Sequence, residues 1–234
     1  MGSRLVALGF DAHDPELLAR FWAGVLDRAV ADDGVTLPTD DDLQFSIRFL
    51  PTDVPKTQPN QIHFDLTSSS LDAQQRTVER ALELGGSHLD IGQGDVDHVV
   101  MADPEGNEFC VIEPGNGFLA DTGTIGALSS DGSQAVGYFW SEALGWPLVW
   151  DQDEETAIQS PRGGSKISWG GPPLRVKDGR NRLRLELSPG DLDQHAEVDR
   201  LLSLGARRVD TGREDADRVV LADPDGNEFC VASR

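Results

Sequence analysis

One segment of this chain occurs twice. Residues 99–111 read VVMADPEGNEFCV, and residues 219–231 read VVLADPDGNEFCV, at a spacing of 120 residues. Two dipeptides recur at a similar offset, Phe21-Trp22 at Phe139-Trp140 and Leu84-Gly85 at Leu204-Gly205. A period this long that is seen only twice indicates a duplicated domain, because the units of solenoid proteins run to roughly 20 to 50 residues.

The length of the chain agrees with two domains. Splitting 234 residues at the repeat gives two halves of the commonest domain size. The segment 114–123 is rich in glycine and predicts a linker. We therefore expect one domain over residues 1–115 and a second over residues 122–234.

The composition limits the compartment and the partners. No apolar run could span a bilayer, and the first residues lack the pattern of a signal peptide. Each half has one cysteine and no internal disulfide partner, which is typical of a reducing compartment, so we expect a cytoplasmic protein. A net charge of −21 argues against nucleic acid or an anionic membrane as partner. We expect a small-molecule ligand and a monomer or homodimer.

The hydrophobic pattern predicts two modules of one strand, one helix and further strands in each half. In the first half, strands are expected at 4–10 and 44–49 around a helix that begins at Asp14-Pro15. A second round follows, with a strand at 61–66, a helix at 71–84, and strands near 87–90, 98–102 and 108–113. The second half repeats the order, with helices at 134–144 and 195–204. The predicted fold class is α+β.

This order, closed in each half by Asp-Pro-acidic-Gly-Asn-Glu-Phe-Cys-Val, resembles the vicinal oxygen chelate superfamily, and within it the tandem glyoxalase-like proteins. The superfamily includes glyoxalases, extradiol dioxygenases, fosfomycin-resistance enzymes and bleomycin-sequestering proteins. The resemblance implies two tandem glyoxalase-like domains, in which paired βαβββ modules curl mixed sheets into a cleft. It does not specify an activity. Whether the clefts form within or between the halves stays open.

Strand alternation predicts which side chains face the cleft. Because Ile62, Phe64 and Leu66 should pack on the following helix, His63 and Asp65 point the other way. The same parity predicts one polar concavity in each half. In the first half it comprises Gln44, Ser46, Arg48, Gln61, His63, Asp65 and Cys110, and in the second Ser168, Arg182, Arg184, Glu186, Glu228 and Cys230.

The resemblance also implies where a metal would be held. In the first half the ligand positions fall on Ala7, His63 and Cys110, of which only His63 is a conventional ligand. In the second half Arg184 stands at such a position, and a guanidinium cannot coordinate a metal. We expect no cofactor; the alternative is a divalent metal in the first domain, held by His63 and Cys110.

The cysteines and tryptophans have simpler interpretations. Cys110 and Cys230 lie in identical contexts, which favours small packing residues over reactive thiols. Trp22 and Trp140 are expected in the core. Trp146, Trp150 and Trp169 lie in strand-like segments of the second half, where they could form a pocket wall.

Three functions are consistent with the sequence. The first is a metal-free protein that binds an apolar or aromatic compound, of the bleomycin-resistance type. Its ligand-binding residues would be Arg48, Cys110, Trp169, Arg184, Glu186 and Cys230. The second is a lyase, isomerase or dioxygenase that uses metal at His63 and Cys110, or His63 as a general base oriented by Asp65. The third makes the second half a diverged structural copy.

Overall fold

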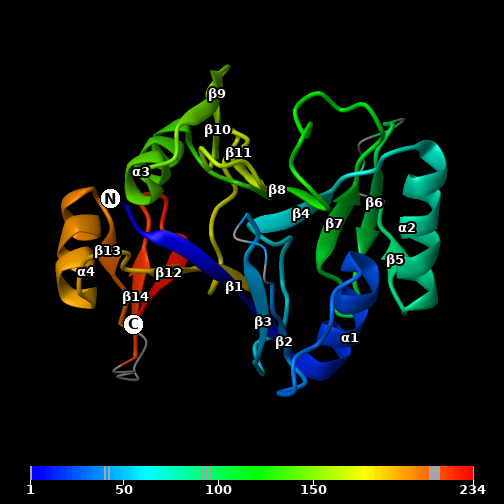
Figure 1. Cartoon of the computed structure of the whole chain (residues 1–234), viewed down its shortest axis with the longest axis horizontal. Helices are drawn as coiled ribbons and strands as arrows, with labels where there is room; N and C mark the ends of the chain where they lie inside the picture. The colour runs from blue at the N-terminus through cyan, green and yellow to red at the C-terminus, as the bar shows by residue number, and fades with distance from the viewer. Residues whose placement is uncertain are drawn as a thin grey trace.

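The computed structural model describes residues 2–39, 41, 43–90, 92, 94, 96–210 and 217–233. The first half contains two modules (Figure 1). Module one comprises β1 (Arg4–Ala12), α1 (Pro15–Leu26), β2 (Thr36–Leu37) and β3 (Ser46–Pro51). Module two comprises β4 (Ile62–Leu66), α2 (Leu71–Glu83), β5 (Ser87–His88), β6 (Val99–Ala102) and β7 (Glu108–Val111).

The second half repeats this plan with one longer hairpin. Module three comprises β8 (Ile125–Ser130), α3 (Gln134–Leu144), β9 (Leu148–Gln152), β10 (Glu155–Gln159) and β11 (Lys166–Trp169). Module four comprises β12 (Leu183–Ser188), α4 (Gln194–Ser203), β13 (Arg207–Arg208), β14 (Arg218–Ala222) and β15 (Glu228–Ala232). The predicted α+β class and the predicted order of modules are confirmed.

Each sheet combines strands from both halves. Among the described residues, one sheet has seven strands in the order β13-β14-β15-β12-β1-β3-β2, and the other has eight in the order β5-β6-β7-β4-β8-β11-β10-β9. The joints are two antiparallel pairs, β1 with β12 and β4 with β8. Module one therefore shares a sheet with module four, and module two with module three. This answers the question that the sequence left open, since each curled sheet spans the two halves.

Aromatic packing, in contrast, joins the two modules within each half. The ring of Trp22 on α1 lies edge-on to Phe64 and Phe109 of module two, with centroids 4.9 and 5.0 Å away. Trp140 on α3 makes the matching contact with Phe229, at 4.9 Å. Such edge-on pairs add about 0.5 to 1.5 kcal/mol to the burial of the rings. Each half is thus held by its core, while the sheets bind the halves to each other.

The repeated turn is fixed to this core. Asp103 accepts hydrogen bonds from the backbone N–H of Asn107 at 2.9 Å and from the indole Nε1 of Trp22 at 3.2 Å. Asp223 accepts the equivalent bond from Trp140 at 3.1 Å. Burial raises the pKa of Asp103 and of Asp223 to about 6, against the opposing effect of these donors. The duplicated Asp-Pro sequence is therefore a structural anchor that ties each final hairpin to a helix.

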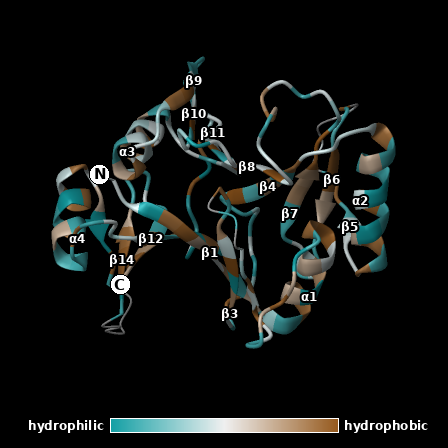
Figure 2. Cartoon of the chain, in the orientation of Figure 1, coloured by the Kyte–Doolittle hydropathy of each residue, from teal (hydrophilic) through white to brown (hydrophobic). Residues whose placement is uncertain are grey.

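The first helix begins at the predicted N-cap, and the helices turn their apolar side chains toward the core. Asp14 caps α1 by accepting from the N–H of Leu17, with Pro15 at the first helical position. Helices α2 and α4 carry hydrophilic residues over much of their surface, as Figure 2 shows. No helix among the described residues is long and apolar enough to cross a membrane.

Candidate functional site

The cleft face of each sheet is the face opposite its helices. In β4 the side chains of Phe64 and Leu66 join the main core, as do Phe109 and Val111 in β7. Cys110 lies on the other face, where it packs with Ala127 of β8. The predicted parity of these strands is confirmed.

The cleft face of the seven-stranded sheet is occupied by ion pairs. Glu186 on β12 is only 2% exposed and accepts from two guanidinium groups, Arg48 Nη1 at 2.9 Å and Arg218 Nη1 at 2.8 Å. These three side chains come from β12, β3 and β14, so they bridge much of the sheet. A carboxylate shared in this way satisfies both of its oxygens within the protein.

A second pair fills the neighbouring part of that face. Arg184 is 2% exposed and binds Asp11 through both terminal nitrogens, at 2.8 and 2.5 Å. Although burial opposes its charge, the hydrogen bonds and the charge of Asp11 hold the pKa of Arg184 above its ordinary value. Arg184 also donates to the carbonyl of Asn181 at 2.5 Å. Both terminal nitrogens of Arg184 are thus engaged inside the protein.

The eight-stranded sheet carries short polar side chains in the corresponding place. Strand register aligns His63, Ser129, Ser168, Ala157 and Trp150 in one row across β4, β8, β11, β10 and β9. The next row contains Cys110, Asp65, Ala127, Lys166 and Gln159. The two rows, which we call the floor, lie on one face of the sheet and come from both halves.

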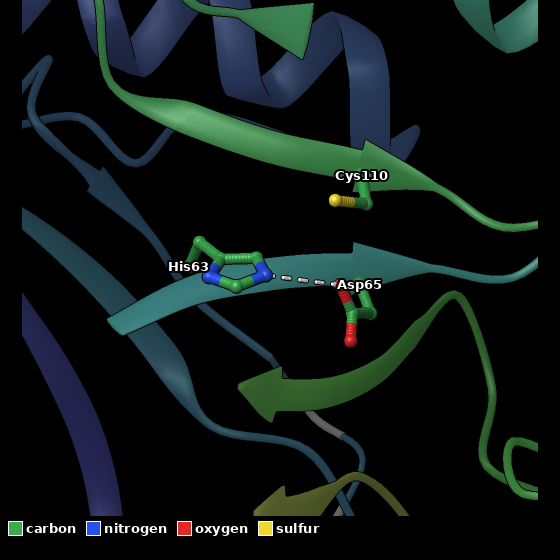
Figure 3. A group of neighbouring side chains, drawn as sticks. All are labelled: His63, Asp65 and Cys110. Carbon is green, nitrogen blue, oxygen red and sulfur yellow. Dashed lines mark ion pairs between the residues drawn. The ribbon is translucent and has the colours of Figure 1, made fainter. Parts of the chain in front are cut away.

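Asp65 is the centre of a hydrogen-bond network in this floor. Its Oδ2 accepts from Ser129 Oγ at 2.5 Å, and Ser129 Oγ lies 3.3 Å from Ser168 Oγ. Its Oδ1 lies 3.4 Å from His63 Nε2, two residues away on the same strand (Figure 3). The carboxylate thus connects the imidazole to a pair of hydroxyl groups.

Cys110 lies beside Asp65 as a protonated thiol. It is 8% exposed, and burial, with the charge and hydrogen bonding of Asp65, raises its pKa to about 12. Cys230 in the other sheet also has a raised pKa, because its burial outweighs the nearby positive charge of Arg184. Neither thiol has the low pKa of a nucleophilic cysteine.

The donor atoms of His63, Asp65 and Cys110 form a candidate metal site. One nitrogen, one oxygen and one sulfur lie within 4.8 Å of one another. Bond lengths of about 2.0 to 2.3 Å place the ligand atoms of a tetrahedral zinc within that limit. A metal at this place would have to displace the proton of Cys110, whose pKa is raised, and would share Asp65 with the hydroxyl of Ser129. The three side chains thus offer nitrogen, oxygen and sulfur donors to a divalent ion, and Asp65 is hydrogen-bonded to Ser129.

A pocket of about 260 Å³ opens beside this network. Ser168 lines it together with Ala157, and the rings of Phe118 and Trp150 meet edge-on at its wall, with centroids 6.5 Å apart. Glu155 stands exposed among the lining residues. The pocket thus combines aromatic walls with a few polar groups, which is typical of small-molecule sites.

The linker between the halves covers part of this cleft. Leu119 packs on Cys110 and Ala127, while Phe118 extends to Trp150. Lys166 holds the linker by donating from Nζ to the carbonyl of Phe118, and Nζ lies 4.6 Å from the centre of its ring. Burial lowers the pKa of Lys166, which is consistent with an amine enclosed under the linker.

The predicted grouping of the polar residues is wrong. We expected Gln44, Ser46 and Arg48 to share a concavity with His63, but β3 belongs to the seven-stranded sheet and β4 to the eight-stranded sheet. Likewise Ser168 joins His63 rather than Arg184. The reason is that alternation along a strand determines which face of the sheet a side chain occupies. Which strands become neighbours depends on long-range pairing, which alternation does not determine.

The predicted ligand-binding residues are consequently divided between two places. Arg48, Arg184, Glu186 and Cys230 lie on the cleft face of the seven-stranded sheet, and Cys110 lies with His63 and Asp65 in the other. Trp169 borders the pocket but is 2% exposed and belongs to the main core.

Sequence reasoning missed Ser129, Phe118 and Lys166. Ser129 lies at the end of β8, and its alternation with Leu128 gives its face but not its contact with Asp65. Phe118 lies in a segment interpreted only as a linker. A large aromatic residue within a glycine-rich linker is a signal that could have suggested a packing role.

Comparison with known proteins supports the fold. A family model described as "Glyoxalase-like domain" matches residues 7–112 and again residues 127–232. Glyoxalase I from Zea mays is similar in structure, with a TM-score of 0.66 at 13% identity over 99% of this chain and 92% of that chain. A variant of the maize enzyme gives 0.62 at 14% identity, over 99% and 94%. No curated protein sequence matches. The chain therefore belongs to the glyoxalase-like domain family of the vicinal oxygen chelate superfamily.

Proposed function

We propose that this protein binds a small apolar or aromatic compound in the cleft of the eight-stranded sheet, without a metal. The observation that carries the proposal is the pocket beside Ser168, which has aromatic walls and a hydrogen-bonded floor. Phe118 and Trp150 supply large, rigid apolar surfaces, and Ser168 supplies a polar contact that would orient the compound.

The other cleft face supports the same choice of site. A ligand at Glu186 or Arg184 would have to displace ion pairs in which these two side chains are almost fully buried, although Arg48, a partner of Glu186, is 39% exposed. Breaking a buried pair by removing one partner typically costs about 3 to 5 kcal/mol. We therefore assign Arg48, Arg184, Glu186 and Cys230 a structural role and limit the ligand proposal to the eight-stranded sheet.

The test is a binding titration with a panel of aromatic and quinone-like compounds, followed by isothermal titration calorimetry. For any compound that binds, Trp150→Ala is expected to weaken the affinity by about 1 to 2 kcal/mol, through loss of aromatic contact. Arg48→Ala is the matched control, because it lies in the other sheet and leaves Glu186 paired with Arg218. Equal effects of the two substitutions would contradict the assignment of the site.

A second candidate is favoured by the proximity of His63, Asp65 and Cys110. It is a metal-dependent lyase, isomerase or dioxygenase with a divalent ion at these residues, or an enzyme with His63 as a general base oriented by Asp65. Metal analysis of protein purified without chelator or affinity tag distinguishes it. A stoichiometric divalent ion that is lost in His63→Ala would replace our first proposal.

A further inference from the structure

The direction of one hydrogen bond at the pocket is fixed by the chemistry of its partners. An ionised carboxylate only accepts hydrogen bonds, so the 2.5 Å bond between Ser129 Oγ and Asp65 Oδ2 uses the hydroxyl hydrogen of Ser129. A serine hydroxyl has one hydrogen. Ser129 therefore has none left for a second bond and offers only lone pairs to its other neighbour.

Because Ser129 has no hydrogen left to donate, the direction of its contact with Ser168 is also determined. Its Oγ lies 3.3 Å from Ser129 Oγ, and that bond forms only if Ser168 gives its own hydrogen to Ser129. Among the described residues Ser168 makes no other side-chain hydrogen bond. Its remaining lone pairs lie at the pocket that it lines. Ser168 thus presents an acceptor, and not a donor, to whatever enters.

The wall of the pocket also contains a donor, the indole N–H of Trp150. Glu155, which is exposed at the rim, is an acceptor when ionised. Thr156 alternates with Ala157, and so faces α3, where the absence of a side chain at Gly137 leaves room for it. Lys166, a cation in the next row of the same face, gives a hydrogen bond to the carbonyl of Phe118.

We infer that the pocket recognises an aromatic compound carrying a hydrogen-bond donor, a phenolic O–H or a ring N–H, which Ser168 accepts, while Asp65 and Ser129 set the direction of that bond. The inference rests on the proposed function and adds the chemical class of the ligand. Asp65 and Ser129 are positioning residues, because they act through Ser168.

The test compares 2-naphthol with 2-methoxynaphthalene, which differ by methylation of the hydroxyl. Isothermal titration calorimetry of the wild-type protein should show that 2-naphthol binds about fivefold more tightly, the value for one net hydrogen bond. Ser168→Ala should reduce this ratio to about one. Ser46→Ala, which removes a hydroxyl from β3 in the other sheet, is the control and should leave the ratio unchanged.

Asp65→Ala separates the relay from a simple contact. It removes the acceptor of the Ser129 hydrogen, so Ser129 can donate to Ser168, and Ser168 can donate to the ether oxygen. The ratio should then fall below the wild-type value in favour of 2-methoxynaphthalene. Where circular dichroism shows that this variant does not fold, Ser129→Ala serves instead, because it also frees the hydrogen of Ser168 and should lower the ratio.

The outcomes are distinct. Equal binding of the two probes to the wild-type protein, or an unchanged preference in the folded Asp65 or Ser129 variant, would overturn the inference and leave the proposed function standing. Failure of both probes to bind at millimolar concentration would contradict the proposed function as well as the inference.

Discussion

The cleft faces of the two sheets have equivalent strands but carry different side chains. The repeat places Arg184 where the other sheet has His63, Glu186 where it has Asp65, and Arg48 where it has Ser168. The guanidinium groups of Arg48 and Arg218 reach Glu186 across an intervening strand, and Arg184 reaches Asp11 on the next strand, so the seven-stranded sheet is cross-linked by ion pairs. Short hydroxyls in the eight-stranded sheet keep their bonds among themselves and leave room for a pocket. The two faces thus differ in the side chains at equivalent positions, which are long and charged in one sheet and include short hydroxyls in the other.

The largest test of this comparison is removal of one carboxylate from each sheet. Asp11→Ala leaves Arg184 buried without its partner, and we expect a loss of about 3 to 5 kcal/mol in the free energy of unfolding. Asp65→Ala removes the partner of a hydroxyl and is expected to cost about 1 kcal/mol. Urea denaturation measures both. Similar losses would show that the two faces do not differ in this way.

The two repeated turns, unlike the two cleft faces, should respond alike to pH. For Asp103 and Asp223 the pKa in the folded state is about 6, above the ordinary carboxyl value of 3.8. Their protonated forms therefore favour the folded state, and this contribution is full below pH 3.8 and is lost as the pH rises through 6. As the pH rises through this range, we expect each turn to lose roughly 3 kcal/mol of its contribution to the free energy of unfolding.

Asp103→Asn and Asp223→Asn provide the measurement. Each should remove its own share of the pH dependence of the unfolding free energy between pH 4 and pH 7, by the same amount. Denaturation curves at a series of pH values report this slope. A marked difference between the two variants would mean that the turns, like the clefts, have diverged.

A smaller effect is expected at the linker. Phe118→Ala removes one wall of the pocket and should weaken a bound aromatic compound by about 1 kcal/mol, or about fivefold. Arg218→Ala, in the other sheet, should leave that affinity unchanged. Titration calorimetry with one compound compares them. An equal loss in both would place the ligand elsewhere.

The smallest expected difference lies between the cysteines. Both thiols are buried and have raised pKa values, but the guanidinium groups of Arg184 and Arg218 favour the thiolate of Cys230, whereas Asp65 disfavours that of Cys110. Iodoacetamide at pH 9 should therefore modify Cys230 faster, as measured by mass spectrometry of peptides. Faster modification of Cys110 would contradict this account of the local charges.

Much of the architecture could be predicted because local patterns determine it. Apolar periodicity gave the helices, and alternation placed His63 and Asp65 on the face away from α2. The partner strands could not be predicted, because the sequence of β3 does not indicate that β1 pairs with β3 on one side and with β12 on the other. For this reason Arg48 was grouped with His63, although it binds Glu186. The serine relay has the same origin, because it joins three strands from two halves.

The linker covers one of the two sheets and not the other, and this difference has a consequence for engineering. Leu119 and Phe118 cover the eight-stranded sheet because the chain must pass from β7 to β8 there. The equivalent passage in the other sheet, from β15 to β1, would join the chain ends. A circular permutant that opens residues 113–124 and connects the two ends of the chain with a copy of that segment would carry the cover to the cleft face of the other sheet. The copy of Phe118 would then lie near Arg48 and Arg184 instead of Ser168, and the uncovered pocket would show how much of its affinity depends on the linker.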